Sequence, residues 1–86
     1  MSIQQEVIAA GGSTRDKGQS WIISYWHVPG GYNYVAAEAR TCFIDDKAVA
    51  DSIAERYRGA PEMAFIISRE DYEKARQQTQ SRVVAI

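Results

Sequence analysis

The chain has 86 residues and a formal net charge of -1, with 10 Lys and Arg residues against 11 Asp and Glu residues. A chain of this length forms a single domain, 1–86, with a small core. The balanced charge excludes the long-range attraction that draws basic proteins to nucleic acid or anionic membranes. Hydrophobic residues make up 45% of the chain, which is typical of a globular domain rather than a disordered one.

The start of the chain and its cysteine content indicate a cellular compartment. The first residues lack the basic region and apolar run of a signal peptide. No segment approaches the roughly 20 apolar residues of a membrane span. The single cysteine, Cys42, cannot form an internal disulfide, which fits a reducing environment. We therefore expect a cytoplasmic protein without membrane contact.

The first half of the chain predicts three strands. Ser2–Ala10 is rich in apolar residues and ends at a Gly pair, which favours a strand, although Gln4–Glu6 would also suit a short helix. A polar loop follows up to Gln19. Ser20–His27 is the strongest strand candidate, because Trp, Tyr and Ile favour a pleated surface. A Pro-Gly-Gly turn joins it to a second arm over Tyr32–Ile44, which predicts a β-hairpin.

Alternation along the hairpin predicts two faces. In the first arm, Trp21, Ile23 and Tyr25 are expected under a helix, and Trp26 on the open face. A register slip of one residue would exchange these faces. In the second arm, the set expected under the helix is small and mostly apolar: Val35, Ala37, Ala39, Thr41 and Phe43. The opposite, solvent-facing set is Tyr32, Tyr34, Ala36, Glu38 and Arg40.

The second half begins with an amphipathic helix. Its apolar side is formed by Val49, Ala50, Ile53, Ala54 and Tyr57. Asp45 or Asp46 can cap its start, and Gly59 can end it in a left-handed conformation. The apolar run from Met63 to Ile67 predicts a buried strand, so Phe65 is expected in the core with Ile53.

The C-terminal part predicts a second helix. Ser68 to Asp71 matches a capping box, and the helix is expected from about Arg69 to Gln78. Arg82–Ile86 suits a last strand or a packed tail. The expected order is thus β-β-β-α-β-α, followed by a final β if Arg82–Ile86 forms a strand rather than a tail. Because strands precede helices, we predict an α+β fold whose mainly antiparallel sheet of about four strands carries a helix on one face.

No motif indicates catalysis, a metal or a cofactor. His27 is the only histidine, and the sequence identifies neither a nucleophile nor an orienting carboxylate for it. One Cys and one His cannot fill a metal site, so Cys42 is expected to be a buried, inert thiol. Asp45, Asp46 and the acids after them fit capping and surface ion pairs better than an acidic site. We therefore expect a protein that is not an enzyme and needs no cofactor.

Aromatic residues on the hairpin are the most informative feature for function. Large aromatic side chains at a sheet surface are typical anchors in protein interfaces, although they can also merely pair across strands. Few basic residues lie near them, which disfavours a nucleic-acid platform. The candidate protein-binding residues are Trp26, His27, Tyr32, Tyr34 and Arg40. An alternative surface is the arginine-bearing C-terminal half.

In its size, slight acidity, element order and lack of motifs, the chain resembles small phage-encoded inhibitors of the anti-CRISPR kind. That resemblance implies a protein that binds a bacterial CRISPR effector complex and blocks its binding of target DNA or its recruitment of a nuclease. Two alternatives come from other classes. One is a housekeeping or regulatory subunit that forms homodimers through its sheet. The other is a small-molecule binder that uses the aromatic hairpin.

Overall fold

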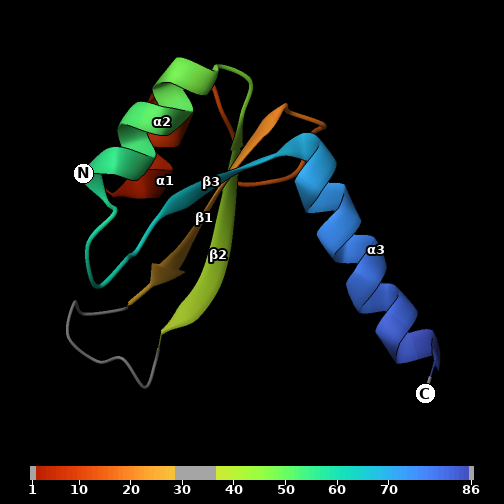
Figure 1. Cartoon of the computed structure of the whole chain (residues 1–86). Helices are drawn as coiled ribbons and strands as arrows, with labels where there is room; N and C mark the ends of the chain where they lie inside the picture. Colours follow the sequence, from red (N-terminus) through yellow and green to blue (C-terminus); the bar gives the residue numbers. More distant parts are fainter. Residues whose placement is uncertain (1, 29–36, 86) are drawn as a thin grey trace.

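The computed structural model describes the backbone of residues 2–28 and 37–85 and the side chains of these ranges up to residue 78 (Figure 1). The elements in chain order are α1 (Ile3–Ala9), β1 (Trp21–His27), β2 (Glu38–Ile44), α2 (Lys47–Arg56), β3 (Phe65–Ser68) and α3 (Arg69–Ala85). The predicted α+β class is confirmed. The predicted count of about four strands is wrong, because the described sheet has three, in the order β2-β1-β3.

The segment predicted as the first strand is the helix α1. Ser2 caps it: the Gln5 backbone N–H donates to the Ser2 hydroxyl at 3.2 Å, and the Ser2 N–H donates to the Gln5 side chain at 2.9 Å. Ile3 and Val7, one turn apart, are the two buried residues of this helix. The helical spacing of these two residues and the capping box therefore prevail over the run of apolar residues that suggested a strand.

Both neighbouring strands run antiparallel to β1, which lies at the centre of the sheet. Tyr25 lies opposite Arg40, and Ile23 lies opposite both Cys42 and Ile66. Residues opposite one another share a face of the sheet. The prediction for β1 was therefore right, with Ile23 and Tyr25 in the main core.

The predicted faces of β2 are wrong. Cys42 and Ile44 point into the core with Ile23, whereas Phe43 lies on the other face, opposite Ile22. The sequence pattern misled because Cys42 and Ile44 continue the face that carries the charged Glu38 and Arg40. Glu38 and Arg40 lie at the outer end of this face, beyond the part that α1 and α2 cover. The Pro-Gly-Gly turn and the start of the second arm lie outside the described residues.

The structure confirms the predicted apolar side of α2. Ala50, Ile53 and Ala54 are buried, and Val49 and Tyr57 pack against the same core. Asp46 is the cap, since its carboxylate accepts from two backbone N–H groups of the first turn. Asp45 instead accepts from the Ser20 N–H at 3.0 Å.

The end of α2 differs from the prediction. The helix stops at Arg56, and Gly59 does not adopt a left-handed conformation. Met63 has the positive φ angle in this connection, at 49°. The strand β3 begins at Phe65 and lies at an edge of the sheet. Ile66 packs on the core, but Phe65 is 55% exposed, so its predicted burial is wrong. Successive side chains of a strand alternate, and Phe65 belongs to the face that α2 does not cover.

Two helices, rather than the single one predicted, cover one face of the sheet. Figure 1 shows α1 and α2 together on one side and α3 directed away from the other. Tyr72 in the first turns of α3 makes an edge-to-face contact with Phe43, with 5.9 Å between ring centroids. No Gly or Pro interrupts the segment after Gln78, so α3 continues to Ala85 where a last strand or tail was expected.

Candidate protein-binding surface

Three exposed hydrophobic side chains gather at one end of the sheet. Among the described residues, four large hydrophobic side chains are exposed, and three of them are Trp26 (46%), Met63 (58%) and Phe65 (55%). We call Trp26, Met63 and Phe65, together with Ala37 and Pro61 beside them, the Trp26 patch. Exposed apolar clusters of this kind commonly mark interaction sites, whereas single exposed residues do not.

Backbone pairing brings the members of the patch together. Phe65 lies opposite Ser24, and Trp26 is the next residue of β1 on the same face. The Trp26 N–H donates to the Glu62 carbonyl at 2.9 Å, which holds the 61–63 connection against the end of β1. A hollow of about 260 Å³ lies between Trp26, Ala37, Pro61 and Met63. The patch therefore combines a shallow apolar depression, which has Trp26 as its aromatic wall, with the exposed Phe65 on the same face of the sheet.

A second concavity, of about 340 Å³, shares Trp26 with this patch. We call it the Trp26 cleft, and it lies where the start of α1, the end of β1 and the connection after α2 meet. Its lining residues are Ser2, Ile3, Gln4, Tyr25, Trp26, His27, Val28, Tyr57 and Glu62. It is thus lined by three aromatic residues and several polar ones, unlike the apolar hollow.

The structure brings together only part of the predicted site. Trp26 lies on the open face as predicted, and half-buried His27 lines the cleft beside it. Arg40 lies on the opposite face, since its strand partner is Tyr25, and its guanidinium donates to Glu38 at 2.6 Å. Tyr32 and Tyr34 lie outside the described residues.

Sequence reasoning missed Met63, Phe65 and Glu62 as surface residues. The apolar run from Met63 to Ile67 reads as a buried strand, and periodicity alone does not reveal that β3 lies at an edge. The edge position follows from β1 pairing with both β2 and β3, which is a property of the whole sheet. Pro61 and the apolar residues after it predict a turn followed by a strand, but they do not indicate that these side chains are exposed.

Buried polar groups under the sheet show no sign of chemical activation. Cys42 is fully buried, and its thiol donates to the Tyr25 hydroxyl at 3.9 Å. Burial raises the pKa of the Cys42 thiol, and the Tyr25 contact only partly opposes this. Burial also raises the pKa of Tyr25 well above its usual value. Because a nucleophilic cysteine needs a lowered pKa, Cys42 is suited to packing.

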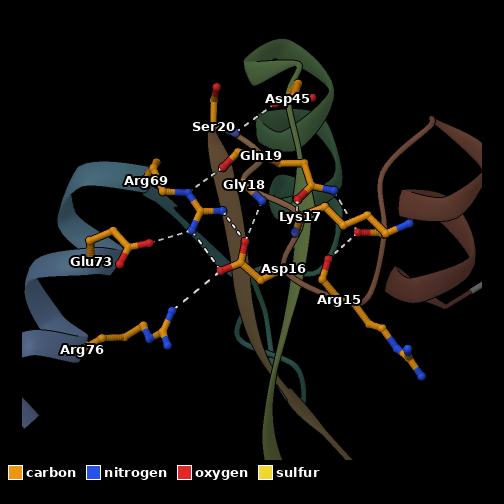
Figure 2. Close-up of polar contacts among 11 residues, drawn as sticks. Arg15, Asp16, Lys17, Gly18, Gln19, Ser20, Asp45, Arg69, Glu73 and Arg76 are labelled. Atoms are coloured by element: carbon orange, nitrogen blue, oxygen red, sulfur yellow. Dashed lines mark hydrogen bonds and ion pairs between the residues drawn. The ribbon is translucent and has the colours of Figure 1, made fainter. Parts of the chain in front are cut away.

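A polar network fixes the start of α3. Figure 2 shows the Arg69 guanidinium between Asp16 and Glu73, with donor–acceptor distances of 2.7 and 3.0 Å to Asp16 and 2.9 Å to Glu73. Arg69 also donates to the Gln19 carbonyl at 2.8 Å. The Arg69 hydrogen bonds lower the pKa of Asp16 to about 2, with help from the Gly18 N–H. These contacts tie the loop before β1 to α3, which is a structural role.

Comparisons with protein families, with curated proteins and with solved structures find no match for this chain. Within the described residues, no helix is both long and apolar enough to cross a membrane, and no three His, Cys, Asp or Glu side chains gather as a metal site. The Trp26 patch and the Trp26 cleft are the features with chemistry suited to binding: an apolar depression beside a cleft with aromatic and polar walls.

Proposed function

We propose that this chain is a non-enzymatic protein-binding domain that engages its partner through the Trp26 patch. The observation that carries the proposal is the clustering of Trp26, Met63 and Phe65, three of the four large hydrophobic side chains exposed among the described residues. Large apolar and aromatic side chains around a hollow suit an anchor residue from a partner. The buried, high-pKa Cys42 thiol supports a role without catalysis.

The form of binding that we propose first is inhibition of a bacterial CRISPR effector complex, in a host cytoplasm if the gene is phage-borne. The support is the small size, the slight acidity and the α+β class on which the resemblance rests. The element order gives it less support, because the chain starts with a helix rather than a strand. An interference assay tests this form: cells that express the protein should fail to clear a targeted plasmid.

A homodimer formed through the sheet is the alternative, because the Trp26 patch lies on the sheet face that α1 and α2 leave uncovered. In that case light scattering would report twice the 9.6 kDa mass of the chain. The Trp26→Ala variant would then return the protein to a monomer. A binding partner of a different kind would leave the purified chain monomeric.

The test of the proposed surface is a quantitative capture experiment with Trp26→Ala. We expect this variant to weaken partner binding by at least about 1–2 kcal/mol, because aromatic anchors dominate many interfaces. Ile8→Ala is the matched control, since Ile8 is 59% exposed but lies on α1, outside the patch. Equal retention of a captured partner by wild type, Trp26→Ala and Ile8→Ala would contradict the proposal.

A further inference from the structure

We propose that the free edge of β3 binds an extended segment of a partner protein, which adds to the sheet as an antiparallel strand. The segment belongs to the partner of the proposed function, on which this proposal rests. The edge is open because β3 pairs with β1 on one side, and no described strand lies on its other side. In strand addition, backbone hydrogen bonds supply the affinity and alternate side chains supply the specificity.

Backbone hydrogen bonding shows which groups of β3 face outward. The Arg69 N–H donates to the Ser20 carbonyl at 2.9 Å, in the register that pairs β3 with β1. Along an antiparallel strand, residues that bond to the neighbouring strand alternate with residues whose backbone groups face away from it. Ile67 therefore bonds to β1, whereas the N–H groups of Ile66 and Ser68 and the carbonyl of Ile66 face outward. Within the described part of the chain, no hydrogen bond reaches these two N–H groups.

The opposite edge of the sheet is already partly covered by the chain itself. In β2 the backbone of Phe43 faces outward in the same way, and its N–H and its carbonyl both pair with Ser13 at 2.8 Å. The outer end of β2 carries the ion pair of Glu38 and Arg40, and charged side chains discourage pairing at an edge. β3 contains no charged residue, so its edge is the better template for another strand.

A groove of about 400 Å³ runs beside this edge, between α2 and β3. Phe65 and Ile66 both line it although they point to opposite faces, so the groove lies along the edge of the strand rather than over one face. Ala54 and Ala64, which are small and buried, leave room in it for an apolar side chain. Charged residues of α2 and the turn after it form its outer wall: Asp51, Glu55 and Arg58.

The dimensions of the edge favour a peptide segment over a second copy of this chain. Four residues at about 3.4 Å each give an edge of about 14 Å. Stable protein interfaces bury roughly 800 Å² on each partner, which so short an edge does not supply. An extended segment follows the edge and also reaches the Trp26 patch, because Phe65 belongs to the patch and lines the groove.

Alternation along the added strand sets the chemistry of the segment. In an antiparallel pair, the residue opposite Ile66 lies on the same face of the sheet, which is the face that α2 covers. An apolar side chain at that position would enter the groove beside Ala54 and Ala64. The N–H of the same residue would bond to the outward carbonyl of Ile66. The segment is therefore expected to be apolar at alternate positions.

The test is an NMR titration of the ¹⁵N-labelled protein with the end-blocked synthetic peptide Lys-Thr-Val-Thr-Val-Thr-Lys. Two matched probes carry N-methyl groups either on the valines or on the threonines. We expect the unmodified peptide to shift the N–H resonances of Ile66 and Ser68 and to slow their exchange with solvent. The Ile67 N–H, which already bonds to β1, is the internal control and should keep its exchange rate.

Methylation of the valines should weaken binding at least about tenfold, because it removes the donors that face β3. Methylation of the threonines, whose N–H groups face away from β3, should leave binding unchanged. Equal binding of the two methylated peptides, weaker binding with methylated threonines alone, or unchanged exchange at Ile66 and Ser68 would overturn the inference. Slower exchange at these two residues when the protein alone is concentrated would also overturn it, in favour of a second copy at the edge.

Failure of this inference and failure of the proposed surface give different results. Resonance shifts confined to Trp26 and Met63 would place the peptide in the Trp26 patch without strand addition. That result would refute the inference and leave the proposed function standing. Slower exchange at Ile66 and Ser68 with the peptide, together with full capture of the partner by Trp26→Ala, would support the inference and refute the patch.

Discussion

Replacing Ile53 and Phe65 in turn tests how the layers of this fold are assigned. Both residues are apolar, and both were expected in the core from the sequence. In the structure Ile53 is 2% exposed and packs in the main cluster, whereas Phe65 is 55% exposed on the face that α2 does not cover. We therefore expect Ile53→Ala to be strongly destabilising and Phe65→Ala to be mild, although phenylalanine is the larger residue.

The magnitudes follow from the burial of each side chain. Ile53→Ala removes three carbon groups from the core, worth about 2.4 kcal/mol at about 0.8 kcal/mol each. The remaining cavity raises the expected loss to about 3–5 kcal/mol. Full burial of a phenylalanine is worth about 1.5–3 kcal/mol, so Phe65, with roughly half of its surface buried, should lose about 1 kcal/mol.

Urea unfolding followed by circular dichroism measures the difference. A domain of 86 residues should have a free energy of unfolding of about 4–13 kcal/mol, so the loss in Ile53→Ala is a large fraction of the total. With a slope of about 1.5 kcal/mol per molar urea, its midpoint should fall by about 2 M or more, and that of Phe65→Ala by less than about 1 M. Equal shifts of the two midpoints would refute the assignment of Phe65 to the open face.

The remaining predictions concern Cys42, Asp16 and nonspecific DNA. Cys42 should react slowly with a thiol reagent in the native protein, because it is buried and its pKa is raised; rapid labelling would contradict this. The pKa of Asp16 falls from 3.8 to about 2 in the folded state, so its stabilising contribution is full above about pH 4 and is lost as the pH falls toward 2. Unfolding measured across this range should show less pH dependence in Asp16→Asn, and an unchanged profile would argue against the Arg69 contact. With its charge of -1, the protein should show no salt-dependent micromolar binding to random duplex DNA at physiological salt, which a fluorescence titration can test.

Local patterns in the sequence determined the elements that depend on local interactions. The apolar spacing of Val49 to Tyr57 predicted which side of α2 is buried, and Asp46 was one of two residues predicted to cap it. The Ser68 cap of α3 is confirmed by its hydroxyl, which accepts from the Asp71 N–H at 3.2 Å. Such patterns are reliable because helix caps and helix faces are set by residues three or four positions apart.

The same local rules explain two of the errors. For α1 the capping pair Ser2–Gln5 was present in the sequence, but the neighbouring apolar run favoured a strand. For α3 the absence of Gly and Pro allowed the helix to pass Gln78. In a seven-residue segment helical and strand patterns overlap, so periodicity does not distinguish them.

Which residues come together in the candidate surface is decided by the tertiary structure. The sequence placed Trp26 on the open face because alternation along a single strand is a local property. It did not place Met63 and Phe65 beside Trp26, nor Arg40 on the opposite face, because these positions depend on the pairing of β1 with β2 and β3. Strand order and register are fixed by contacts between residues far apart in the chain, and one step of register moves a side chain to the other face of the sheet.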